Sequence, residues 1–201
     1  AAMLEPFGIA VHACLEGAGV SGMSVLINGC GPIGLMAVAV ARVLGASQII
    51  AADINPLRLK TAEVMGADRV IKADEEDVVA VVKDMTGEDG VDVGIEFSGS
   101  EIGFAAVFES LCKGGDMRLV GAPPGPIPVD FTWWLLKCPR LFNIHGRRIW
   151  DTWQRSTELI YSGSVDLKPI QSHLIPLSKA TQGFELIRRG EAVKPILIPE
   201  G

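Results

Sequence analysis

Short and almost uninterrupted apolar runs recur along this chain and alternate with segments of helical pattern. The runs have the length of buried β-strands and lie at residues 25–28, 48–53, 69–71, 91–97, 117–120 and 141–144. Runs that are apolar at consecutive positions are typical of strands covered on both faces, as in a parallel sheet. The pattern therefore predicts an α/β protein.

The helical segments between these runs have recognisable ends. Residues 32–44 are rich in Ala, Leu and Val, begin at Pro32 and stop before Gly45, and the next segment begins at Pro56 and stops before Gly66. Proline suits the first turn of a helix, and glycine suits the position after its end. Alternation of strand and helix predicts a doubly wound, six-stranded parallel sheet of order 3-2-1-4-5-6 with helices on both faces.

On this pattern the chain has three parts. Residues 1–22 are a helical lead-in, residues 23–163 form the doubly wound domain, and residues 164–201 are a looser return segment with a helix at 178–189 and a strand at 195–198. Ligands of such sheets bind at the carboxyl ends of the strands, where the strand order reverses. We therefore expect functional residues directly after strands, with the proline-rich loop at 121–128 as one wall of the crevice.

Composition and charge exclude several classes of protein. The net charge is −6 and the 18 Lys and Arg residues are scattered, so nucleic acid is not an expected partner. The chain lacks an apolar run of about 18 residues, which argues against a membrane helix. Its four cysteines lie far apart without a C-x-x-C pair, and its first residues lack the pattern of a secretory signal, so we expect reduced thiols in a cytoplasmic protein.

The turn after the first strand carries the pattern G-x-G-x-x-G. It consists of Gly29, Gly31 and Gly34, with Pro32 and Ile33 between the last two glycines. The pattern alone is weak in a chain with 23 glycines, but a strand before it and a helix after it make it specific. The first glycine allows a tight turn, the second admits a pyrophosphate, and the third packs the helix on the strand. Amides at the helix start hold phosphate charge, so the motif predicts a dinucleotide-binding Rossmann domain.

Asp53 ends the second strand, nineteen residues beyond Gly34. A carboxylate there accepts hydrogen bonds from the adenosine ribose diol and repels a 2′-phosphate, which favours NAD over NADP. Arg58, five residues further on, has three open interpretations. It neutralises a 2′-phosphate, stacks on the adenine, or is an ordinary surface arginine, and Asp53 favours stacking.

Several motifs together resemble the zinc-dependent medium-chain dehydrogenase/reductase superfamily. They are Glu-Pro-Phe-Gly at 5–8, Ala-Val-His at 10–12, the glycine turn, Asp-Ile-Asn at 53–55 and the proline-rich loop. Later segments at 144–147, 150–153 and 159–163 are most similar to the L-threonine 3-dehydrogenase family. This resemblance implies oxidation of L-threonine to 2-amino-3-oxobutanoate with NAD. A polyol or secondary-alcohol dehydrogenase and a non-catalytic NAD-sensing or interaction module are the alternatives.

The resemblance also implies roles for individual residues. Beyond the turn, Asp53 and Arg58, it implies cofactor contacts around the nicotinamide half at Val120, Gly121, Ala122, Ile144 and His145, and near the phosphates or ribose at Arg147. Glu5 corresponds to a carboxylate near the catalytic zinc, implicated in metal coordination or a proton relay. An acid at a helix N-terminus is an equally good interpretation of Glu5.

The resemblance further implies that this chain is a cofactor-domain fragment. The zinc ligands of the family lie in an N-terminal substrate domain that has no counterpart here, so zinc is expected in the full-length parent, with no ligand in this chain. Residues 1–22 and 164–201 are then remnants of that domain, and the fragment alone is expected to be inactive. Family members are dimers or tetramers, and residues 127–144 are the candidate interface. Trp133 and Trp134 belong either to it or to the core.

Overall fold

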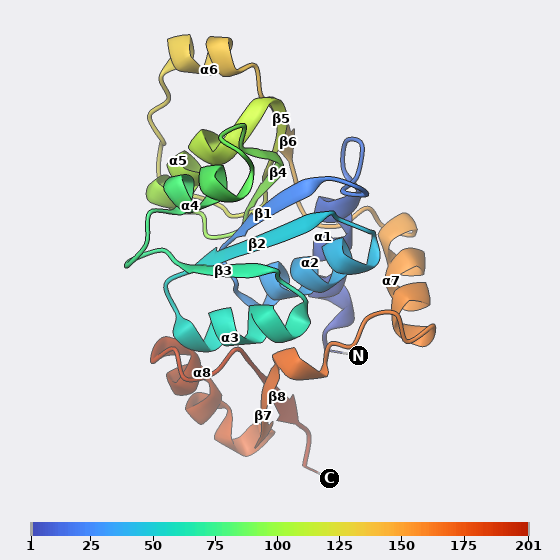
Figure 1. Ribbon diagram of the computed structural model, residues 1–201. Helices are drawn as coiled ribbons and strands as arrows, with labels where there is room; N and C mark the ends of the chain where they lie inside the picture. Colours follow the sequence, from blue (N-terminus) through green and yellow to red (C-terminus); the bar gives the residue numbers. More distant parts are fainter. Residues whose placement is uncertain (1, 201) are drawn as a thin grey trace.

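A computed structural model describes residues 2–200 of the chain. Its centre is a six-stranded sheet of order β3-β2-β1-β4-β5-β6 in which all neighbouring strands are parallel (Figure 1). The strands are β1 (Ser24–Asn28), β2 (Gln48–Asp53), β3 (Arg69–Lys72), β4 (Val91–Glu96), β5 (Leu111–Leu119) and β6 (Arg140–Asn143). The predicted doubly wound order is therefore confirmed.

Helices cover both faces of this sheet and bury most of its central strands β1, β2 and β4. On one face lie α1 (Leu4–Leu15), α2 (Pro32–Val43) and α3 (Pro56–Met65), and on the other lie α4 (Val78–Met85) and α5 (Glu101–Ser110). Side chains of β1 alternate between the two cores: Val25 and Ile27 pack toward α2, and Leu26 packs toward α4 and α5. Because both faces of β1 and β2 are buried, the interior positions of these strands are all apolar, and this is the pattern that predicted them.

The ends of α3 follow the chemistry that the sequence indicated. Pro56 occupies its first turn, and the Asn55 side chain accepts hydrogen bonds from the backbone N–H groups of Leu57 and Arg58. Gly66 ends the helix in the left-handed conformation with φ of 108°. Glycine adopts this conformation without steric cost, so the prediction of this helix is confirmed at both ends.

Three helices and a small sheet lie outside this core. α6 (Phe131–Lys137) lies beyond β5 at the top of the view, and α7 (Asp151–Tyr161) packs on α1 (Figure 1). β7 (Gln171–Pro176) and β8 (Lys194–Ile198) form a separate two-stranded parallel sheet, joined by α8 (Ala180–Arg188) and flanked by short 3₁₀ turns at Lys168–Ile170 and Leu177–Lys179. The sequence analysis located α8 and β8 and missed β7.

A buried arginine ties the end of α1 to the sheet. Arg118 on β5 is fully buried, and its Nη1 donates to the Ala13 carbonyl at 2.8 Å. Its Nη2 donates to the Gly19 carbonyl at 2.7 Å and to Asp116 Oδ2 at 3.2 Å. Arg140 contacts the second carboxylate oxygen of Asp116 at 2.6 Å.

Within residues 2–200, no helix has both the length and the apolar character needed to cross a bilayer.

Candidate functional site

The three glycines of the turn after β1 differ in their surroundings. Gly29 has φ of +92°, and a Cβ atom there would lie 2.7 Å from the Ser98 backbone nitrogen. A Cβ on Gly34 would lie 2.0 Å from the Gly29 carbonyl oxygen. A Cβ on Gly31, in contrast, would meet no atom within 4 Å. Packing thus requires glycine at the first and third positions, whereas the second faces open space, as expected where a ligand approaches the backbone.

The first turn of α2 presents its amides to this open space. Gly31 is the N-cap and has no side chain to cap the helix, and Pro32 occupies the first helical position. The first turn contains no acidic residue, so the positive end of the helix is not neutralised from within it. Backbone N–H groups at a helix start have no intrahelical partner, and those of Ile33 and Gly34 suit an anion.

Asp53 connects the end of β2 to this turn. The residue is only 7% exposed, and its Oδ2 accepts a hydrogen bond from the Cys30 backbone N–H at 2.7 Å. Its Oδ1 accepts one from the Asn55 backbone N–H at 2.8 Å. Arg58 Nη1 lies 3.6 Å from Oδ2. The carboxylate is thus fixed beside the turn, with the guanidinium of Arg58 next to it.

These residues share one cleft of about 640 Å³ at the carboxyl ends of the strands. Gly29, Gly31, Asp53 and Arg58 line it, so the structure brings together the predicted residues that lie around the turn. Other lining residues were not predicted from the sequence, among them Ser98 and Ile102 after β4, and Asp74 after β3. Their position after strands was the available signal, because the crevice of such a sheet lies there.

The predicted residues of the nicotinamide half follow β5 and β6. The backbone N–H groups of Val120 and Gly121 both donate to the Glu96 carbonyl at 2.9 Å, which holds the end of β5 beside β4. The Ile144 N–H donates to the Leu119 carbonyl at 2.8 Å. These hydrogen bonds hold the segments that follow β4, β5 and β6 side by side at the carboxyl edge of the sheet. Ala122 and His145 are exposed, so both are accessible to a ligand.

The proline-rich loop lines a second cleft. This cleft has a volume of about 650 Å³ and is mainly apolar, with Pro123, Pro126, Phe104 and Trp134 among its lining residues. The loop thus forms a wall of this second cleft, on the side of the sheet where α5 and α6 lie, and not of the cleft that Gly31 and Asp53 line.

Glu96 is a buried acid that the sequence analysis did not single out. It ends β4 as Asp53 ends β2, and it is 2% exposed. Its Oε1 accepts from the Ser98 N–H at 2.8 Å and from Asn28 Nδ2 at 3.2 Å, and its Oε2 accepts from the Gly99 N–H at 2.9 Å. Glu96 therefore fixes the turn after β4 against the glycine turn. An acid that ends an apolar run was the signal in the sequence.

Arg147 packs against α1, and Glu5 belongs to that helix. The guanidinium carbon of Arg147 lies 4.3 Å from the centroid of the Trp153 ring, and its Nη1 is buried without a hydrogen-bond partner among the described residues. Glu5 is exposed on the first turn of α1. Among residues 2–200, no three His, Cys, Asp or Glu side chains come together as metal ligands. The described residues therefore do not form a zinc site by themselves, and no chemical step is assigned to zinc.

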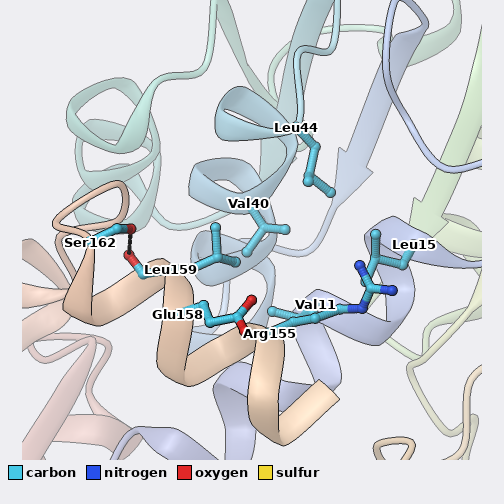
Figure 2. Close-up of a pocket in the computed structure, with 8 residues that line it drawn as sticks. All are labelled: Val11, Leu15, Val40, Leu44, Arg155, Glu158, Leu159 and Ser162. Carbon is cyan, nitrogen blue, oxygen red and sulfur yellow. Dashed lines mark hydrogen bonds between the residues drawn. The ribbon is translucent and has the colours of Figure 1, made fainter. Parts of the chain in front are cut away.

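A smaller pocket lies between α1, α2 and α7 (Figure 2). Its volume is about 230 Å³, and it is lined by Val11, Leu15, Val40 and Leu44 together with side chains of α7. Val40 and Leu44 belong to the C-terminal part of α2 and its end, whereas the glycine turn precedes the N-terminus of that helix. This pocket is therefore separate from the cofactor cleft.

Comparison with known proteins decides the family. The family described as zinc-binding dehydrogenase matches residues 32–162. The chain belongs to this family. Within it, the L-threonine 3-dehydrogenase of Bacillus velezensis is 42% identical over 200 residues, which are 99% of this chain and 58% of that protein. The L-threonine 3-dehydrogenase of Bacillus subtilis is 40% identical over 99% of this chain and 57% of its own length.

Solved structures of zinc-type dehydrogenases share the fold. The alcohol dehydrogenase from Thermus sp. ATN1 superimposes with a TM-score of 0.87 at 33% identity, over 98% of this chain and 58% of that one. The 2R,3R-butanediol dehydrogenase from Bacillus subtilis gives a TM-score of 0.89 at 27% identity, over 99% and 57%. The chain thus spans less than two thirds of these relatives, and the resemblance seen in its motifs is confirmed.

Proposed function

We propose that this chain is the NAD-binding domain of a zinc-dependent dehydrogenase that oxidises L-threonine to 2-amino-3-oxobutanoate by hydride transfer to NAD. The observation that carries the proposal is the juxtaposition of an open Gly31 and the Asp53 carboxylate in one cleft. The choice of L-threonine as the substrate is supported by relatives named L-threonine 3-dehydrogenase, which are up to 42% identical to this chain.

The described residues fit each part of the cofactor. The pyrophosphate belongs against Gly31 and the first amides of α2, where the helix dipole favours negative charge. The adenosine ribose belongs at Asp53, and Arg58 in the same cleft offers its guanidinium plane to the adenine. When bound, NAD supplies the carbon that accepts the hydride.

The nicotinamide half belongs on the surface that follows β5 and β6. Val120, Gly121 and Ala122 offer backbone groups that suit a carboxamide, and Ile144 and His145 lie on the neighbouring strand end. The buried, unpartnered Nη1 of Arg147 suits a phosphate or ribose oxygen. These residues orient the ring and exclude water from one side of it.

Glu5 is proposed to act near the reacting hydroxyl, as a metal ligand or in a proton relay. Its exposed position on α1 leaves the carboxylate accessible to a facing domain. In the complete gene product, Glu5→Gln tests both roles at once. A large loss of turnover with unchanged NADH affinity supports them, and an unchanged turnover overturns them.

We further propose a cytoplasmic homodimer or homotetramer that pairs through residues 127–144. β6 is an edge strand of the sheet, and α6 beside it exposes Phe131, Leu135 and Leu136. An unpaired edge next to an apolar helix suits pairing with a second copy. Trp134 stacks on Phe108 with ring centroids 5.1 Å apart, so it is part of the packing, while Trp133 is partly exposed.

Turnover by the complete gene product tests the substrate. L-threonine, 2,3-butanediol and sorbitol are supplied separately with NAD, and NADH formation is followed. A kcat/KM for L-threonine at least about tenfold above the other two supports the proposal. A clear preference for either polyol overturns the threonine assignment in favour of the polyol or secondary-alcohol class. Absence of turnover with all three favours the non-catalytic NAD-sensing module.

A further inference from the structure

His12 on α1 joins two parts of the chain that are far apart in sequence. The residue is 8% exposed, and its Nδ1 lies 2.8 Å from the Gly146 carbonyl oxygen. Its Nε2 lies 2.9 Å from Glu16 Oε2, one turn further along the helix. The same carboxylate oxygen accepts a hydrogen bond from Arg148 Nη2. His12 and Glu16 thus hold the segment after β6 from two sides.

These contacts define the protonation state in which both hydrogen bonds form. A backbone carbonyl only accepts, so Nδ1 must carry a hydrogen. An ionised carboxylate also only accepts, so Nε2 must carry one as well. A neutral imidazole has a single N–H and satisfies only one of the two partners. The observed arrangement therefore requires the imidazolium form of His12.

Glu16 remains ionised in this cluster. Burial favours a higher pKa for its carboxyl group. The hydrogen bonds from His12 and from the Gly17 backbone, together with the positive charge of Arg148, outweigh that effect and hold the pKa of Glu16 below its ordinary value. The proton that is lost as the pH rises is therefore the one on His12.

The segment held by this cluster is the one proposed to meet the cofactor. It runs from Ile144 to Arg148 and includes His145 and Arg147. A Cβ atom on Gly8 of α1 would lie 3.0 Å from Arg147 Cδ, so α1 also contacts the segment there. The backbone near it is constrained, with φ of +66° at Gly146 and +74° at Trp150. A positive φ is costly for tryptophan, so contacts around the segment must hold it in place.

We propose that His12 is a positioning residue for cofactor binding: its imidazolium clamps the Gly146 carbonyl to Glu16, and loss of the proton breaks one of these two hydrogen bonds and loosens the hold of α1 on residues 144–148. The inference rests on the proposed NAD site. NADH affinity is then high while His12 is charged and falls as it loses its proton. The test therefore spans the range in which histidine side chains ordinarily change charge, about pH 5 to 8.

Other charged groups lie on the segments that pack against α1. Besides Glu16, Arg147 and Arg148, they are Arg155 and Glu158 on α7, which line the neighbouring pocket (Figure 2). Arg155 pairs with Asp151 on its own helix at 2.8 Å. His145 is a second histidine in the proposed cofactor site, so the pH dependence of the unmodified chain does not by itself identify His12. Substitutions of His12 and of Glu16 do identify it.

The experiment combines NADH titration with amide hydrogen exchange from pH 5.5 to 9 on the purified chain. Exchange is corrected for its intrinsic pH dependence and read on peptides that cover residues 144–150. In the unmodified chain the Kd for NADH rises about tenfold with pH, as expected for the loss of a hydrogen bond to a charged group, and protection of the segment falls in parallel.

Two variants are expected to remove this pH dependence in opposite ways. His12→Gln cannot bridge both partners, so it shows the weak Kd and low protection at every pH. Glu16→Gln offers an amide N–H to a neutral His12 and an oxygen to Arg148, so it keeps the tight Kd and high protection at every pH. His173→Gln, at a histidine on β7, is the matched control and behaves like the unmodified chain.

The outcomes separate this inference from the proposed function. A His12→Gln variant that keeps the pH slope of the unmodified chain overturns the positioning role, as does a Glu16→Gln variant with weak affinity at all pH values. If His12→Gln does not fold, the Glu16→Gln result decides alone. If the unmodified chain shows no saturable NADH binding, the proposed function fails, and hydrogen exchange at residues 144–150 still decides the role of His12.

Discussion

The Asp53 carboxylate accepts a hydrogen bond from the backbone N–H of Cys30 at 2.7 Å. This bond joins the end of β2 to the glycine turn after β1, while the other carboxylate oxygen binds the Asn55 N–H at 2.8 Å. One side chain therefore both fixes the turn and faces the cleft proposed for the adenosine ribose. Its removal is expected to affect both tasks.

Replacement of Asp53 tests the cofactor preference. Asp53→Ala removes the acceptor for the ribose diol and the charge that repels a 2′-phosphate, so NADH affinity is expected to fall about tenfold or more and the gap to NADPH to narrow. Both Kd values are measured by fluorescence titration. Asp74→Ala, which removes another acid from the same cleft, is the control and should keep the gap. A gap between the two Kd values that narrows in Asp74→Ala and not in Asp53→Ala would show that the ribose site has been misplaced.

The glycine turn offers a matched pair of substitutions. Gly31→Val adds a side chain to open space, so we expect the melting temperature to be preserved and NADH binding to be lost. Gly34→Ala places a Cβ 2.0 Å from the Gly29 carbonyl oxygen, so we expect about 1–3 kcal/mol or more of lost folding stability. Calorimetry and NADH titration on both variants separate the effects. A folded Gly31→Val chain with undiminished affinity would rule out pyrophosphate binding at this turn.

Arg118 is expected to contribute to stability and not to cofactor binding. It is fully buried beside Asp116 and donates to carbonyls at the end of α1. Arg118→Met leaves a buried carboxylate and the carbonyls without this donor, so we expect a loss of about 3–5 kcal/mol in urea unfolding. Arg140→Met removes the mostly exposed partner of the same carboxylate and should cost less, on the order of 1 kcal/mol. Equal losses would contradict the buried role.

Thiol reactivity tests the packing around the turn. Burial raises the pKa of the Cys14 thiol to about 12, and burial together with the nearby Asp53 charge raises the pKa of Cys30 as well. Cys138 is exposed. At pH 8, iodoacetamide should therefore modify Cys138 first and reach Cys14 and Cys30 only on unfolding, as followed by peptide mass spectrometry. Rapid alkylation of Cys30 in the folded chain would contradict the structure of the turn.

The sheet and the grouping of the glycine turn with Asp53 were predictable because their signals are local. A parallel strand that is buried on both faces is apolar at consecutive positions, and the runs at 25–28 and 48–53 show this pattern. The glycine turn follows β1, and Asp53 ends β2, the neighbouring strand of the sheet. The sequence between the turn and Asp53 therefore contains one helix and one strand, and both are recognisable from their residues. The largest error in the strands of the main sheet is the start of β5, which was placed at residue 117. The strand begins at Leu111, but a register shift against β4 and the polar stretch around Lys113 interrupt the apolar pattern.

Contacts between distant segments could not be predicted. His12 and Gly146 are 134 positions apart, and no periodicity links them. Arg118 looks like an ordinary surface arginine in the sequence, yet it is fully buried because carbonyls at the end of α1 and Asp116 surround its guanidinium. α6 gave no helical pattern because it leaves several apolar side chains exposed. Such features depend on the assembled tertiary structure.

Fluorescence titration of the unmodified chain with NADH and with NADPH tests the central claim most directly. If Gly31 admits the pyrophosphate and Asp53 holds the ribose diol, NADH binds saturably and at least about tenfold more tightly than NADPH, because a 2′-phosphate loses these hydrogen bonds and meets a carboxylate. Absence of saturable NADH binding, or equal or tighter binding of NADPH, would contradict the account.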